Sequence, residues 1–127
     1  MPQDASPPAP VPPGSGPFAC RVLRETAGTA TLSVCGEIDL ATNDRLHAAL
    51  APLLADERVL LLDLSQITFM DCSGLQVLQT AFQAHDRFAV VAPSVAVTRL
   101  LELSGARLPV YASAEEAIRE LTSDPPR

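Results

Sequence analysis

The sequence VLLLDLSQITFMDCSGLQVL, residues 59–78, decides the fold, because its hydrophobic pattern changes period along its length. Residues 59–64 are apolar on both faces, apart from Asp63, which predicts a central strand covered by other elements. Leu75, Leu78 and Phe82 then recur at helical spacing, which predicts a helix packed by one face. Residues 71–74 lie where the strand has ended and the helix begins. The stretch therefore predicts a buried strand joined by a short connection to an amphipathic helix.

Outward from this stretch the pattern keeps alternating between strand and helix. Residues 18–25 and 29–37 alternate apolar and polar positions around a turn-prone 26–28, which predicts a β-hairpin. The remaining elements are expected as a helix with a Leu46–Leu54 stripe, a strand at 88–92, a helix ending at Gly105, an edge strand at 108–111, and a final helix opened by Ser113 and Glu116. The order β-β-α-β-α-β-α-β-α places the chain in the α/β class. We expect one domain, with a mixed four- to five-stranded sheet and amphipathic helices packed mainly on one face.

The two ends of the chain differ in composition from the part between them. Residues 1–17 hold seven of the twelve prolines, which predicts a disordered tail. Residues 122–127 are polar and contain proline, which predicts a second tail. The folded domain is therefore expected over residues 18–121.

Composition and spacing exclude several classes of function. The net charge is −6, with only nine scattered basic residues, which argues against a nucleic-acid partner. No apolar run is long enough to span a bilayer, and no secretory signal is evident, so we expect a cytoplasmic protein. Three cysteines and two histidines lack metal-ligand spacing, so no metal or cofactor is expected. No Gly-x-Ser-x-Gly elbow is present, and we expect no enzyme.

Short motifs occur in a fixed order along the domain. They are GEID at 36–39, LDLS at 62–65, FMD at 69–71, SGL at 73–75, and APS at 92–94 with VTRLL at 97–101. At these separations the set resembles the STAS family, as found in bacterial anti-sigma factor antagonists. The resemblance covers roughly residues 18–121.

The resemblance implies a regulatory protein that acts by binding a partner. Such antagonists dock on an anti-sigma factor, often a GHKL-type serine kinase, and free a sigma factor. The kinase ends the interaction by phosphorylating the serine that directly follows the aspartate of this motif. Here that position is Cys72, and thiols are not substrates of such kinases. The partner contacts implied are Asp39, Asp71, Cys72, Ser73, Gly74 and Leu75.

Several of these residues have alternative interpretations. Ser73 is the one hydroxyl left in the motif, and it is either the phosphoacceptor or the N-cap of the helix. Asp39 either faces the partner or stabilises a turn. Cys72 is either a redox-sensitive thiol at a helix N-terminus or a small hydrophobe under the loop. A two-residue turn would place Cys20 and Cys35 opposite each other in the hairpin, where a disulfide could form.

Two other functions stay open on the sequence alone. A free-standing STAS domain can serve as a subunit of a lipid or anion transporter, or of a stress-sensing complex. A thiol redox sensor centred on Cys72 is the third possibility.

Overall fold

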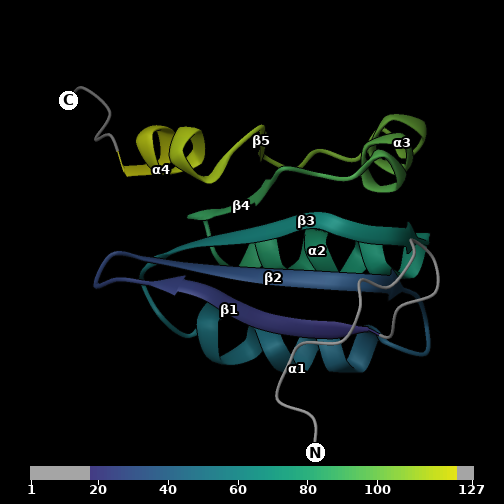
Figure 1. Ribbon diagram of the computed structural model, residues 1–127, viewed down its shortest axis with the longest axis horizontal. Coiled ribbons are helices and arrows are strands. Elements are labelled where there is room, and N and C mark those ends of the chain that lie inside the picture. Colours follow the sequence, from purple (N-terminus) through teal and green to yellow (C-terminus); the bar gives the residue numbers. More distant parts are fainter. Residues whose placement is uncertain (1–17, 123–127) are drawn as a thin grey trace, which may run out of the picture.

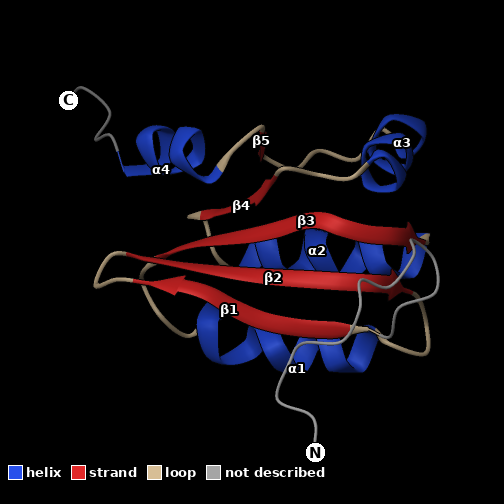
Figure 2. Cartoon of the chain, in the orientation of Figure 1, coloured by secondary structure: helices blue, strands red, loops and turns tan. Residues whose placement is uncertain are grey.

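Strands and helices alternate along the described chain in the predicted order. The computed structural model describes residues 18–122, and its elements are shown in Figures 1 and 2. They are β1 (Ala19–Glu25), β2 (Thr29–Ile38), α1 (Asn43–Leu54), β3 (Val59–Met70), α2 (Cys72–Ala84), β4 (Phe88–Val91), α3 (Val95–Ser104), β5 (Val110–Tyr111) and α4 (Ala114–Thr122). The predicted α/β class and element order are therefore confirmed.

The five strands form one mixed sheet in the order β1-β2-β3-β4-β5. β1 is antiparallel to β2, and the other neighbouring pairs are parallel. β4 pairs only with Leu60–Asp63, so the second half of β3 continues past the end of β4. Because β2 and β3 are parallel and end together at Ile38 and Met70, the loops that follow them meet at one edge of the sheet.

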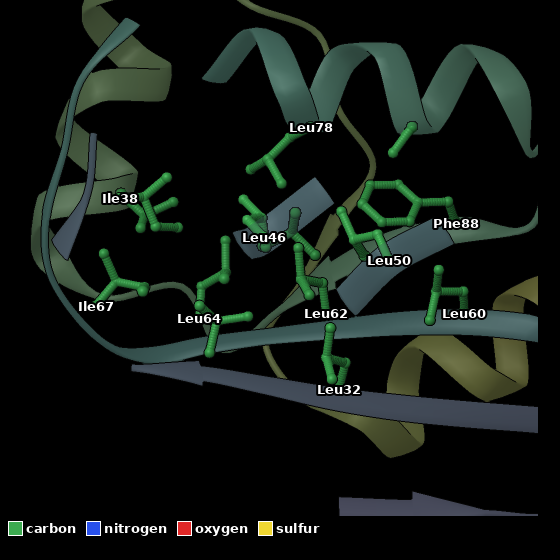
Figure 3. Close-up of a cluster of buried hydrophobic side chains, with 14 of the residues drawn as sticks. Leu32, Ile38, Leu46, Leu50, Leu60, Leu62, Leu64, Ile67, Leu78 and Phe88 are labelled. Carbon is green, nitrogen blue, oxygen red and sulfur yellow. The ribbon is translucent and has the colours of Figure 1, made fainter. Parts of the chain in front are cut away.

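Side chains of β3 enter two separate cores on opposite faces of the sheet. Leu60, Leu62 and Leu64 join a cluster to which α1, α2 and α3 all contribute, and Figure 3 shows part of it. Val59 and Leu61 point to the other face, where Ala117 of α4 is fully buried. In Figure 1, α1 and α2 lie behind the sheet. Three of the four described helices are thus packed on one face, as predicted, while α4 covers the other face, so β3 is apolar on both sides.

The register of the hairpin differs from the prediction for the cysteines. Ala19 is the partner of Cys35, and Cys20 is the partner of Val34, because the ladder is irregular between Val22 and Arg24. A shift of one residue turns a side chain to the other face of a sheet. Cys20 and Cys35 are consequently not opposite each other, and both are free thiols. Burial raises the pKa of the Cys20 thiol, which further disfavours oxidation.

The predicted tails fall mostly outside the described residues. The expectation of disorder at 1–17 and 123–127 therefore stays a prediction. Thr122, expected as the first residue of the second tail, is the last residue of α4. Among residues 18–122, no helix has both the length and the apolar character needed to cross a membrane.

Candidate functional site

Motif residues 36–39 and 69–75 lie where β2 and β3 end, on the right of Figure 1. There the backbone N–H of Asp71 donates to the carbonyl of Ile38 at 3.1 Å, which ties the two strand ends together. We use the name rim for the surface formed by residues 39–43, Phe69 and residues 71–73. The rim carries the first residues of both α1 and α2.

Asp71 is the N-cap of α2. Its Oδ1 accepts hydrogen bonds from the backbone N–H of Gly74 at 3.0 Å and from the hydroxyl of Ser73 at 2.6 Å. The Ser73 hydroxyl is the main cause that lowers the pKa of Asp71 below its usual 3.8, with backbone amides adding to the effect. Asp71 is therefore an ionised carboxylate held in a fixed orientation.

Ser73 connects the starts of the two helices. Its Oγ accepts a hydrogen bond from Asn43 Nδ2 at 2.7 Å while donating to Asp71. The prediction that Ser73 caps α2 is wrong, because Asp71 stands two residues earlier and already accepts from the free helix amide. Ser73 instead locks α1 to α2, and its hydroxyl is fully engaged in doing so.

Asn43 is a site residue that sequence reasoning missed. It is the first residue of α1, and its side-chain amide reaches Ser73 on α2. Its Oδ1 is buried and has no hydrogen-bond partner within residues 18–122. No sequence signal shows that positions 43 and 73 meet, since thirty residues separate them.

Cys72 faces solvent between these two engaged side chains. Its thiol is exposed and makes no hydrogen bond within the described part of the chain. The interpretation of Cys72 as a small hydrophobe under the loop is therefore wrong. Asp71 and Ser73 turn toward each other, and the residue between them points outward.

Gly74 and Leu75 were expected to contact a partner, yet both are buried. A Cβ on Gly74 would lie 2.4 Å from Cγ2 of Ile38, so glycine allows α2 to approach the end of β2. Leu75 is only 4% exposed. These two buried residues support the rim from the core side of α2.

Asp39 forms the other half of the rim. Its Oδ1 accepts from the backbone N–H groups of Ala41 and Thr42 at 3.0 and 3.2 Å, an Asx-type turn that leads into α1. The interpretation of Asp39 as a turn residue is therefore confirmed, and the side chain remains partly exposed at the surface of the rim. Leu40 and Phe69 beside it are 80% and 47% exposed. The rim therefore combines two carboxylates with exposed apolar side chains.

The histidines stand apart from the rim. His47 is exposed on α1, and buried His85 contacts the carbonyl of Arg58 through Nε2 at 2.8 Å. No group of three or more metal-ligating side chains occurs among residues 18–122.

Comparison with known proteins identifies a family and similar relatives. The family model described as STAS domain matches residues 21–117. The anti-sigma-F factor antagonist RsfB of Mycobacterium tuberculosis is 35% identical over 82 residues, which cover 61% of this chain and 67% of RsfB.

Solved structures of similar proteins share the fold. An anti-sigma factor antagonist from Mycobacterium paratuberculosis is 28% identical, with a TM-score of 0.72 over 83% of this chain and 96% of that one. The Bacillus anti-sigma factor antagonist SpoIIAA, in its unphosphorylated form, has a TM-score of 0.66 over 81% of this chain and 96% of its own. At 21% identity, the likeness to SpoIIAA concerns the fold alone.

Proposed function

The chain belongs to the STAS domain family, and we propose that it is an anti-sigma factor antagonist, a regulatory module that binds an anti-sigma factor and thereby frees a sigma factor. The names of its similar proteins support this proposal. The observation that carries it is the rim, where the motif residues form a prebuilt and partly exposed surface. Nothing in this function requires chemistry by the chain itself.

The physical character of the rim indicates what a partner must offer. Asp39 and Asp71 present carboxylates, while Leu40 and Phe69 present apolar surface. A complementary surface has lysine or arginine beside apolar side chains. Because hydrogen bonds already lock the two helix starts together, binding costs little ordering of the rim.

The finer part of the proposal concerns the partner's identity and its control. We propose a GHKL-type serine kinase as the anti-sigma factor, acting on Ser73, since Cys72 occupies the usual acceptor position. A phosphoryl group on Ser73 adds a charge of about −1.5 to −2. It would replace the hydrogen bond donated to Asp71 with repulsion, and it would crowd Asn43. The rim would be disrupted while the two cores on either side of the sheet remain.

Affinity capture from the native cell tests the docking proposal. The decisive variant is Asp39→Asn with Asp71→Asn, because the amide oxygens still accept the turn hydrogen bonds while both charges are lost. The matched control is Asp86→Asn with Glu57→Gln, because these residues precede β4 and β3 and so lie at the opposite end of the strands from the rim. We expect an anti-sigma factor to be recovered by wild type and control, and to be depleted for the rim variant. Recovery of membrane transporter subunits, or equal recovery by the rim variant, would reject the proposal.

Phosphorylation is tested separately, with the captured kinase and ATP. Mass spectrometry should show one added phosphoryl group on wild type and on Cys72→Ala, and none on Ser73→Ala. An unmodified wild type would remove the kinase part of the proposal and leave docking intact.

A further inference from the structure

β1 begins next to the rim. Ala19 pairs with Cys35, three residues before β2 ends at Ile38. Phe18 is 7% exposed, with the guanidinium of Arg45 4.9 Å from its ring centroid and donating to its carbonyl at 3.1 Å. The position of Phe18, the first described residue, is therefore fixed beside the rim.

Two exposed apolar side chains of the rim lie on this side of the domain. Phe69 pairs with Glu37, on the strand next to β1, and Leu40 follows Glu37 by three residues. Met70 is buried in the core between the sheet and the helices, so the adjacent Phe69 points to the opposite face of the sheet. Leu40 and Phe69 leave apolar surface open to a binding segment.

The sequence before Phe18 has a suitable composition for this surface. Residues 7–13 read PPAPVPP, and no charged side chain occurs from Ala5 to Cys20. Proline-rich segments bind aromatic and apolar surfaces at a low entropic cost, because their backbone is already restricted.

The length of the connection also fits. From Phe18 to Phe69 is about two residues along the strands and two strands across, or about 12 Å. The five residues from Pro13 to Phe18 span about 15 Å when extended as polyproline II. A tether of this kind holds its segment at an effective concentration on the order of a millimolar.

We propose that residues 7–13 occupy the rim of the same chain, against Leu40 and Phe69, and that a partner must displace them. The competition with a partner rests on the proposed function, whereas the contact itself does not. With a contact that dissociates at about 0.1–1 mM, the tethered segment weakens partner binding by about two- to ten-fold.

Amide NMR spectra of the full chain test the contact without any partner. One variant replaces five prolines with serine at constant length, at Pro7, Pro8, Pro10, Pro12 and Pro13. We expect the amide signals of Leu40 and Phe69 to shift, and those of Asp86 and Gly105 to stay. Unchanged rim signals would overturn the contact, as would shifts that vanish on dilution, because those indicate a second copy.

A reciprocal variant, Leu40→Ser with Phe69→Ser, examines the other side. Both side chains are exposed, so the variant should fold, which thermal unfolding verifies. The amide signals of Ala9 and Val11 should move toward those of a free peptide of residues 1–17. Signals that stay at their wild-type positions would overturn the contact.

Calorimetry with the captured anti-sigma factor tests the competition. The proline-to-serine variant should bind about two- to ten-fold more tightly than wild type. Equal affinity would overturn the competition. If the NMR shifts occur but no anti-sigma factor binds, the proposed function fails while the intramolecular contact stands.

Discussion

Replacing Gly74 with alanine should disturb the rim more than any surface change. The new Cβ would lie 2.4 Å from Cγ2 of Ile38 and 3.1 Å from Cγ of Met70. Ile38 is fully buried, so it cannot move aside into solvent. Because carbon contacts favour about 3.5–4.0 Å, the start of α2 must shift by about 1 Å. Alanine gains up to about 1 kcal/mol of helix propensity, but overpacking costs about 1–3 kcal/mol. With so short a contact, we expect a net loss of about 1–2 kcal/mol.

Urea unfolding of Gly74→Ala and of a matched control measures this loss. Gly28→Ala is the control, since a Cβ there meets nothing within 4 Å, and we expect a change within about 0.5 kcal/mol. Leucine at position 38 is unbranched at Cβ and lacks the clashing Cγ2. The double variant with Ile38→Leu should therefore recover about 1 kcal/mol relative to the sum of the two single changes. A Gly74→Ala protein as stable as wild type would refute the close approach of α2 to β2.

Three further changes probe the hydrogen bonds and backbone of the domain. Ser73→Ala leaves Asn43 Nδ2 without its acceptor and should lower the unfolding free energy measured in urea by about 1–2 kcal/mol. Cys72→Ala should lower it by less than about 0.5 kcal/mol. Equal losses for the two variants would contradict the hydrogen-bond network. The folded state lowers the pKa of Asp71, so the ionised carboxylate stabilises the fold above pH 3.8, and this stabilisation is lost as the pH falls through the lower pKa of the folded state. The Asp71→Asn variant should therefore show a flatter decline of the unfolding free energy below pH 4. An unchanged pH profile would contradict this assignment. Gly105 ends α3 at a φ of +69°, so Gly105→Ala should lower the unfolding free energy by about 1 kcal/mol, and a neutral result would contradict a rigid helix end.

Most of the fold could be predicted from hydrophobic period alone. Residues 59–64 are apolar at successive positions because each face of β3 enters its own core, and such a run identifies a central strand. The hairpin register could not be predicted in the same way. Leu23 lies at the irregularity and is exposed, as Val22 is, so neither side chain selects a register through burial. Where no side chain is buried, the sequence pattern carries no information about pairing.

The site was predicted in position but not in its internal contacts. Aspartate and serine are both preferred N-cap residues, so the local rule cannot choose between Asp71 and Ser73. In the structure the Ser73 hydroxyl accepts from Asn43 of another helix and donates to Asp71, and it makes no bond to the amides of α2. Once Asp71 is the cap, Cys72 is the first residue of the helix and points to solvent.

This arrangement separates the construction of the rim from the chemistry of position 72. The side-chain hydrogen bonds of the turn use Asp71 and Ser73, and Cys72 takes part in none within residues 18–122. A serine at position 72 could thus be exchanged for cysteine without loss of the docking surface. The remaining hydroxyl, on Ser73, holds α1 and α2 together. A modification of Ser73 therefore cannot simply add charge to an intact surface, as it could at position 72. It must break the hydrogen bond that Ser73 donates to Asp71 and set two negative charges side by side, so control through this turn is coupled to the order of the rim itself.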